Sequence, residues 1–575
     1  MTCPVFDYKS FQSHVLDKLK REQEAKPEAK PATQSPLHNP HDKPTSTWRI
    51  LEHISLITSQ AKLLFFNFLS HHVTGPRKPS WPIQLTLIIS VMRNLFNHAH
   101  LVNIQQFRQL LDFHNPLIPS DLIVTPVSFR VRPYGLEGVL TDLEGEDCKS
   151  RREIAGEWIV TKELWRKINQ QYYSACHKHY MVDNEGTSWS NEQVILFLHG
   201  GGYYSMSART YRDLTCRLSQ ATERRVFAIN YRLAPEHPFP YGLHDAVHAF
   251  LYLTDPCGLA IQPQNIVVAG DGAGGGLALA MLQYLRDHHM PLPGGAMLFS
   301  PWVDLTMSCD SWDRNQSYDV LIKPNDDDLF HPVRLYLNPY EKRKSLITHP
   351  YVSPLFGDLG HLPPILIQYG DAEVLHDEIS LLVNKIVQTR TTFVQYEVYD
   401  DMVHVFQAFD FLDSAKKALD SAGDFVKNTL PLHQRRNPSY QLPFHRKFAF
   451  PVFDLDAFEA TSAIPEPSVI SSCTPTELLE STTSSKVDKA TSTEEDDVVN
   501  WEPWGCAEQT FSDGESSNAS SNESSHTKVD DDETSDDEQP YARLWRSMSQ
   551  PEFRQLGSAL KTSYIGTRAV CERVC

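Results

Sequence analysis

Three short stretches of the chain hold the residue types that chemistry on a carbonyl group needs. The glycine run His199-Gly200-Gly201-Gly202 follows an apolar run, and backbone N–H groups left open at such a strand end can hold a developing oxyanion. Further along, Glu373 lies in an acidic loop and His404 lies in a loop after the last apolar run. A histidine in such a loop can act as a general base when a carboxylate orients it. The order of these stretches predicts nucleophilic attack on a carbonyl carbon.

The position that should carry the nucleophile holds glycine. Residues 270–276 (GDGAGGG) lie between an apolar run and a helix-like segment. The strand–turn–helix motif G-x-S-x-G places serine at the centre of such a turn, and here the centre is Gly272. Glycine cannot attack a carbonyl, although it relieves the strained backbone that serine adopts there. We interpret Ser205, shortly after the first glycine run, as a cap of the next helix and not as a replacement nucleophile.

The same segment also fits the dinucleotide pattern G-x-G-x-x-G through Gly270, Gly272 and Gly275. That interpretation needs an acidic residue about 20 positions later, at the end of the next strand. Residues 290–300 contain no Asp or Glu. The one Cys/His cluster, at 176–179 (CHKH), lacks a second ligand pair at a suitable spacing. We therefore expect neither an organic cofactor nor a metal.

The elements that must position these stretches alternate between strands and helices. The expected strands are short apolar or β-branched runs at 193–198, 225–230, 265–269, 296–300, 364–368 and 393–399. Most of them are separated by amphipathic segments, near 206–221, 241–254, 274–288 and 374–389. This alternation predicts an α/β fold with a mostly parallel sheet, covered by helices on both faces. Functional groups should then lie at the carboxyl ends of the strands.

Four segments follow from composition and periodicity. Residues 1–46 are expected to form a flexible leader rich in Pro, Lys and Glu, 47–118 a helical cap, 119–435 the α/β domain and 436–575 a mostly disordered tail. The apolar run at 85–92 in the cap is too short to span a bilayer. A cap over a pocket is our main interpretation, and a peripheral contact with membrane or lipid is the alternative.

The net charge of -19 over 575 residues belongs mostly to the tail. Residues 461–540 hold 20 acidic and 3 basic residues, whereas the other 495 hold 52 acidic and 50 basic. We expect no nucleic-acid partner, because that needs clustered Lys and Arg. Ser512 and Ser535 each precede an acidic residue by three positions, which suits acid-directed kinases; a merely solubilising tail is the alternative. Scattered cysteines and an N-terminus without an apolar core predict a cytoplasmic location.

Several motifs together resemble the hormone-sensitive-lipase branch of the α/β-hydrolases, particularly its fungal esterase-like members. They span roughly 120–430 and comprise HGGG at 199–202, YRLAPEHPFP at 231–240, GDxAGG at 270–275, SPWVDLT from Ser300, YVSPLF from Tyr351 and GDAEVLHDE from Gly370. The resemblance implies hydrolysis of a carboxylic ester, of a small molecule or a lipid, without metal or organic cofactor.

The resemblance also implies roles for particular residues. Glu373 would be the acid and His404 the base, with Asp377 and Asp371 as alternative acids. The oxyanion donors would be the backbone N–H groups of Gly200, Gly201 and Ala273. The family's nucleophilic serine falls on Gly272. The sequence is therefore compatible with an impaired ester hydrolase and with a non-catalytic protein that binds a ligand or regulates.

Overall fold

The computed structural model describes residues 46–113, 121–174, 180–182, 188–190, 192–436 and 570–573, with the single positions 13 and 17. Most of the expected leader and tail lies outside these described residues, including Ser512 and Ser535. The cluster at 176–179 lies outside them as well. The expectations for those segments stay predictions.

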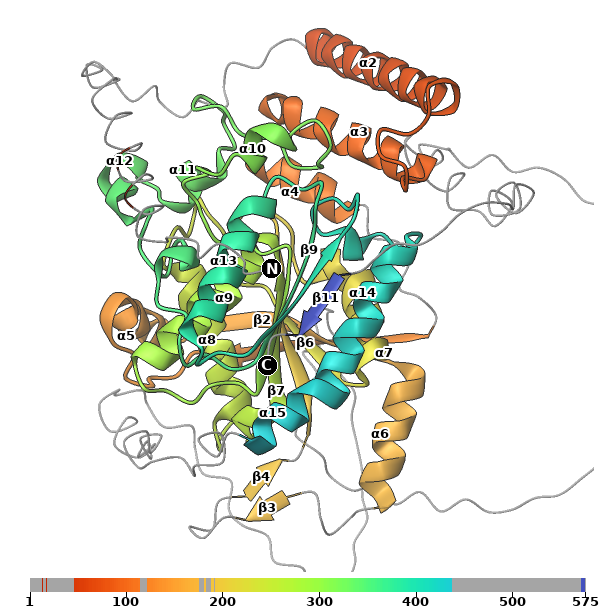
Figure 1. Cartoon of the computed structure of the whole chain (residues 1–575). Coiled ribbons are helices and arrows are strands. Elements are labelled where there is room, and N and C mark those ends of the chain that lie inside the picture. The colour runs from red at the N-terminus through yellow and green to blue at the C-terminus, as the bar shows by residue number, and fades with distance from the viewer. Residues whose placement is uncertain are drawn as a thin grey trace, which may run out of the picture. The chain divides into compact units, whose positions relative to one another are not determined.

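One sheet organises the described chain (Figure 1). In spatial order its strands are β1 (Leu122–Arg130), β2 (Glu153–Thr161), β6 (Arg225–Ile229), β5 (Val194–Leu198), β7 (Ile266–Asp271), β8 (Gly295–Phe299), β9 (Ile365–Gly370), β10 (Val394–Tyr399) and β11 (Val570–Arg573). The strands from β6 to β10 are parallel, whereas β1, β2 and β11 pair antiparallel. Each of the expected strands is present within two residues of its predicted bounds. A separate hairpin joins β3 (Tyr180–Val182) to β4 (Ser188–Ser190).

Helices cover both faces of this sheet, which confirms the α/β fold. The helices outside the cap are α5 (Thr141–Lys149), α6 (Lys162–Ser174), α7 (Arg212–Thr222), α8 (Tyr241–Thr254), α9 (Gly272–Asp287), α10 (Ser311–Arg314), α11 (Pro332–Tyr336), α12 (Tyr340–Arg343), α13 (His376–Thr389), α14 (Asp413–Asp424) and α15 (Leu430–Arg436). Successive residues of β5 point to opposite faces, so Leu196 packs in one core with α8, α9 and α13. Its neighbour Phe197 packs in the second core, with α7 and α14.

Helices α2 (Ser46–Val73), α3 (Ile83–Asn97) and α4 (Ile104–Phe113) precede the sheet. The apolar side of α3 is buried: Leu85 and Ile89 form one cluster with Val403 and Phe406, from the loop after β10. The indole N–H of Trp81 donates to the carbonyl oxygen of Asp401 in the same loop, at 2.6 Å. The N-terminal helices therefore brace the loop that carries His404. None of the described helices is both long and apolar enough to cross a bilayer.

Candidate active site

The chain turns sharply between β7 and α9, and Gly272 lies at the centre of the turn. Its φ of +49° is left-handed, a conformation that glycine adopts without steric cost. A Cβ atom built on Gly272 would lie 3.0 Å from Nε2 of His404. The position therefore faces the imidazole as a nucleophile would, but it carries no side-chain oxygen.

The glycines around this turn serve packing. A Cβ atom on Gly274 would lie 2.1 Å from the carbonyl oxygen of Leu198 at the end of β5. Only glycine lets α9 approach the sheet so closely. This close approach gives glycine at position 274 a role in packing α9 against β5.

Adjacent parallel strands bring the expected acid and base together. Glu373 follows β9 and His404 follows β10, and the two strands pair in register up to Gly370 and Tyr399. Glu373 Oε2 lies 3.2 Å from Nδ1 of His404, and Oε1 accepts a hydrogen bond from the Gly370 N–H at 3.0 Å. The Glu373 side chain is fully buried, whereas that of His404 is 12% exposed. Gly272, His404 and Glu373 thus follow one another in the geometry of a catalytic triad.

Burial sets the protonation of this pair. It raises the pKa of Glu373 to about 8, against the hydrogen bonds from Ser300 and Gly370 that lower it. It also lowers the pKa of His404 below the ordinary value of 6.5, against the attraction of nearby carboxylates. The lowered pKa of His404 favours a neutral imidazole at neutral pH, the form that a general base needs.

Of the three expected acids, Glu373 is the one whose carboxylate contacts His404. The carboxylate of Asp377 accepts a hydrogen bond from Arg314 at 2.6 Å. That of Asp371 accepts one from the backbone of Asp401, also at 2.6 Å. Both alternatives are engaged elsewhere.

Asp319 stabilises both loops and Asn315 stabilises the loop of Glu373, although neither residue lies in a motif of the sequence. The buried Asp319 carboxylate accepts backbone N–H groups of His404 at 3.0 Å and Val374 at 2.8 Å. The Asn315 amide donates to the carbonyl oxygen of Glu373 at 2.8 Å. In the sequence they are two polar residues in a segment without periodicity, and such a pattern does not identify a functional residue.

The glycine run after β5 lies against the elbow. The N–H of Gly200, an expected oxyanion donor, already donates to Asp271 Oδ1 at 3.0 Å. The N–H groups of Gly201 and Gly202 have no acceptor within the described part of the chain. Ala273 lies in the first turn of α9, where backbone N–H groups lack an intrahelical acceptor. The open donors at this edge are therefore those of Gly201, Gly202 and Ala273.

Ser205 is not placed as the sequence suggested. It lies in a turn before the 3₁₀ helix Arg209–Tyr211, and its hydroxyl donates to the carbonyl oxygen of Gly201 at 2.8 Å. The Ser205 hydroxyl thus fixes the shape of the glycine loop. It neither caps a helix nor lies where a nucleophile would lie.

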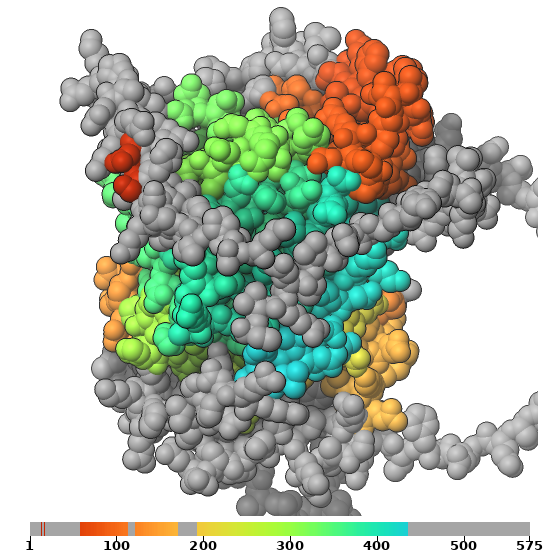
Figure 2. Space-filling model, viewed as in Figure 1, coloured from red at the N-terminus to blue at the C-terminus, as the bar shows by residue number. Residues whose placement is uncertain are grey.

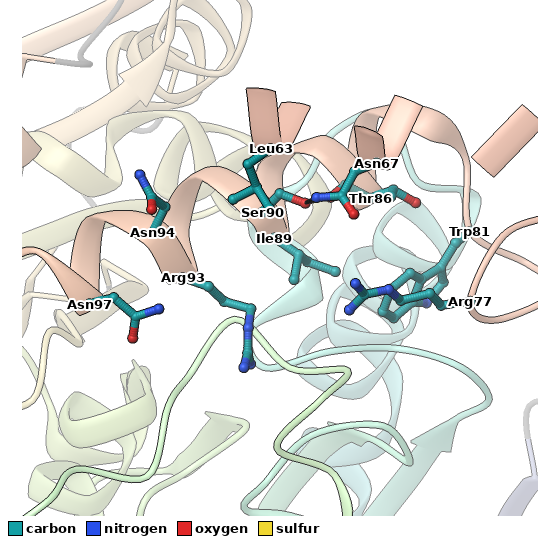
Figure 3. Close-up of a pocket in the computed structure, with 10 residues that line it drawn as sticks. All are labelled: Leu63, Asn67, Arg77, Trp81, Thr86, Ile89, Ser90, Arg93, Asn94 and Asn97. Carbon is teal, nitrogen blue, oxygen red and sulfur yellow. Dashed lines mark hydrogen bonds between the residues drawn. The ribbon is translucent and has the colours of Figure 1, made fainter. Parts of the chain in front are cut away.

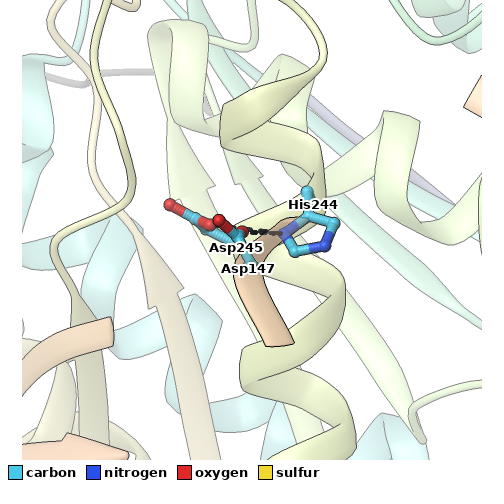
Figure 4. Close-up of side chains that lie close together, drawn as sticks. All are labelled: Asp147, His244 and Asp245. Atoms are coloured by element: carbon cyan, nitrogen blue, oxygen red, sulfur yellow. Dashed lines mark ion pairs between the residues drawn. The ribbon is translucent and has the colours of Figure 1, made fainter. Parts of the chain in front are cut away.

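A second group of acidic and histidine side chains, Asp147 on α5 with His244 and Asp245 on α8, lies close together (Figure 4). Arg232 donates to Asp147 at 2.7 Å and to Asp245 at 2.8 Å. Arg152 donates to Asp245 at 2.8 Å as well. These guanidinium groups already bind the carboxylate oxygens that a cation would need. The cluster is a buried ion-pair network that ties the YRLAPEHPFP segment to α5 and α8.

Comparisons with known proteins place the chain in a family. Residues 195–408 match a family model described as alpha/beta hydrolase fold. An acetyl-hydrolase of Streptomyces hygroscopicus is 37% identical over 236 residues, which are 41% of this chain and 75% of that protein. An esterase of Acinetobacter venetianus is 33% identical over 238 residues, again 41% and 75%. The crystal structure of an esterase from the bacterial hormone-sensitive lipase family has 27% identity and a TM-score of 0.46, covering 61% of this chain and 99% of that one. The chain belongs to the alpha/beta hydrolase fold family, as the match to the family model and the similarity to these two relatives show.

Proposed function

We propose that the protein is a slow carboxylic-ester hydrolase in which His404 activates water. One observation carries this proposal: Gly272 faces Nε2 of His404 without a side chain, while the contact between His404 and Glu373 is intact. A base without a nucleophilic side chain can still remove a proton from water. The names of the relatives, acetyl-hydrolase and esterase, support an ester as the substrate.

In the proposed reaction, His404 takes up one proton and later returns it. Nε2 of His404 takes a proton from water while the water oxygen forms a bond to the ester carbonyl carbon. The carbonyl oxygen becomes an oxyanion, which the N–H groups of Gly201, Gly202 and Ala273 would bind. The intermediate collapses by breaking the bond to the alcohol oxygen, and the imidazolium returns its proton to that oxygen. The products are the carboxylic acid and the alcohol.

Glu373 supports both steps through its contact with Nδ1. In its ionised form, which gains as the pH approaches 8, it accepts the Nδ1–H, fixes the orientation of the ring and stabilises the imidazolium that forms when His404 accepts the proton. Gly200 does not face the oxyanion in this proposal; its bond to Asp271 holds the glycine loop against the elbow. We assign the chemistry to the domain at 119–435 and substrate selection to the cap at 47–118, with a small-molecule or lipid ester as substrate.

The missing hydroxyl sets the expected rate. In a serine protease, removal of the nucleophile costs about a million-fold in kcat, and a residual of about a thousandfold over water comes from the oxyanion hole and binding. We expect turnover of this lower order here.

A second candidate function is that of a non-catalytic ligand-binding or regulatory protein. Gly272 itself favours it, because a retained pocket without a nucleophile can bind an ester or its products without turning them over. The two candidates differ in one measurable quantity, the rate of ester hydrolysis that depends on His404.

The test compares the natural protein with Gly272→Ser and Gly272→Ala on p-nitrophenyl acetate and butyrate. The two variants add the same Cβ atom at the same left-handed backbone position, so their difference isolates the hydroxyl group. A Cβ at 3.0 Å requires His404 to move by a few tenths of an ångström in both. We expect Gly272→Ser to gain at least about a thousandfold over Gly272→Ala.

Loss of the natural protein's slow rate in His404→Ala would support activation of water by that residue. A natural rate equal to that of His404→Ala would overturn the hydrolase proposal in favour of ligand binding. Labelling of the natural protein by a fluorophosphonate would also overturn it, since that reaction requires a nucleophilic side chain.

A further inference from the structure

Helix α2 turns its polar side toward the protein. Its inward residues recur at spacings of four and three, which keeps them on one face of a helix. Three of them hydrogen bond to α3, in the pairs Gln60–Asn94, Asn67–Ser90 at 2.9 Å and His71–Thr86 at 2.9 Å. Figure 3 shows Asn67 reaching Ser90 between the two helices. Hydrogen bonds therefore link the described part of α2 to α3, with the half-buried Leu64 on the same face.

The opposite side of α2 is apolar and faces solvent. We call it the outer face; its apolar residues, with their exposed fractions, are Phe65 62%, Phe66 63%, Phe68 48%, Leu69 46% and Val73 74%. At about 100° per residue these positions fall within one arc of about 160°. Figure 2 shows the orange-red side chains of this region at the molecular surface. A helix on a water-soluble protein has the reverse arrangement, with its apolar side buried.

The stretch of chain between Glu52 and Asp112 carries charged side chains of one sign. Residues 53–111 contain no Asp or Glu, although the whole chain holds 72. The same stretch contains five Lys and Arg residues, at 62, 77, 78, 93 and 108. Lys62 is exposed and precedes Phe66 by four positions, so it lies on the outer face. Lys78 and Arg108 pair with Asp401 and Glu236 from other parts of the chain, so the outer face presents the positive charge of Lys62.

We propose that the outer face of α2 docks on the surface of an anionic phospholipid membrane. Contiguous exposed apolar surface marks a binding site, and phenylalanines with nearby lysine suit the boundary between acyl chains and anionic headgroups. A second copy of this chain fits the face less well. A symmetric contact would bring Lys62 of each copy to the same face, with no acid between residues 53 and 111 to pair with it.

This surface differs from the one that the sequence suggested. The apolar run at 85–92 lies on α3, where Leu85 and Ile89 are buried against the His404 loop. That run serves the internal packing of the cap, and the exposed apolar residues belong to the preceding helix. Because α3 contacts both α2 and the loop after β10, a membrane bound at α2 would lie beside the cap of the candidate active site.

The test is flotation of the full-length protein with vesicles of phosphatidylcholine alone and of phosphatidylcholine mixed with phosphatidylserine. We expect the natural protein to float with the mixed vesicles. The triple variant Phe65→Asn, Phe66→Asn, Phe68→Asn should lower the bound fraction at least about tenfold, since binding scales with buried apolar area. Lys62→Glu should lower binding to the mixed vesicles alone. Leu329→Asn with Leu432→Asn is the matched control, because both residues are exposed and apolar but lie outside α2.

Flotation requires no turnover, so its outcome is independent of the proposed hydrolysis. Equal binding of the triple variant and the natural protein would overturn the assignment to α2. Absence of binding to the mixed vesicles would overturn the proposal, as would equal binding to both kinds of vesicle. A dimer in light scattering that the triple variant abolishes, without flotation, would assign the face to a second copy. Unchanged thermal unfolding would show that the variants are folded.

Discussion

The elbow at Gly272 and the loops that carry Glu373 and His404 differ in what they retain. The acid and the base are in contact, and the buried Asp319 accepts backbone hydrogen bonds from both loops. The elbow keeps its left-handed turn and the close packing of α9, but it lacks the one hydroxyl that would use them. The geometry that the proposed hydrolysis needs is thus present on both sides, and the elbow differs from it by one side chain.

This difference allows the contribution of the nucleophile to catalysis to be measured separately from that of the acid and the base. If the acid and base loops were decayed as well, restoring a serine would restore little. Since these loops retain their buried hydrogen bonds, the structure predicts that the chemistry is limited by the nucleophile and not by the base. The following predictions test the two sides of the site separately.

The largest effect should come from removing the base once a nucleophile is present. In the Gly272→Ser background, His404→Ala should lower kcat by about ten-thousandfold or more, because the serine then has no group to take its proton. Steady-state hydrolysis of p-nitrophenyl butyrate measures it. A loss below tenfold would mean that the imidazole does not serve the elbow despite its position.

Asp319 should act as a positioning residue with a smaller effect. Asn keeps one acceptor oxygen but points an NH₂ group at one of the backbone N–H donors, so Asp319→Asn should displace the His404 or Glu373 loop. We expect kcat in the Gly272→Ser background to fall about tenfold to a hundredfold with KM nearly unchanged.

The matched control for this variant is Asp304→Asn, at another buried carboxylate that accepts hydrogen bonds from Thr306 and Ser308. It should lower the thermal stability without a specific loss of kcat. If both variants lower kcat equally, Asp319 has only a structural role.

The strands could be predicted from the sequence, and so could the order of elbow, acid and base along the chain and the contact between acid and base. Runs such as 193–198 and 364–368 are apolar because both faces of the sheet are covered, so their pattern survives in the sequence. Glu373 and His404 follow neighbouring strands, and parallel strands end at one edge.

The remaining features depend on contacts that the sequence does not encode locally. The hydrogen bond of Gly200 to Asp271 joins residues 71 positions apart, and it changes which glycine N–H groups are open. Asp319 reaches His404 across 85 positions from a segment without regular structure. The orientation of α2 was equally hidden, because an amphipathic pattern is the same whichever side faces the protein.

The protonation of Glu373 can be tested by measuring how the free energy of unfolding depends on pH. Burial raises the pKa of Glu373 from 4.5 to about 8, so between these values the folded protein holds a proton that the unfolded chain has released. This contribution is complete below pH 4.5 and is lost as the pH rises through 8. Glu373→Gln removes this proton binding. The free energy of unfolding of the variant, relative to that of the natural protein, should therefore rise by up to about 1.4 kcal/mol for each pH unit between 4.5 and 8.

Urea unfolding at several pH values measures this difference. Glu341→Gln, at an exposed side chain, is the control variant. A difference between Glu373→Gln and the natural protein that does not change with pH would mean that Glu373 is not held protonated by burial.

The smallest effect concerns the backbone of the elbow. Gly272→Ala places a side chain at φ +49°, which should cost about 1–2 kcal/mol of unfolding free energy. Gly274→Ala should cost more, since its Cβ would lie 2.1 Å from the backbone oxygen of Leu198, which cannot move without displacing β5. Urea unfolding of both variants measures the two costs. Equal stability of Gly272→Ala and the natural protein would show that the elbow carries no strain, and relief of strain would then not explain why glycine stands where the motif G-x-S-x-G has serine.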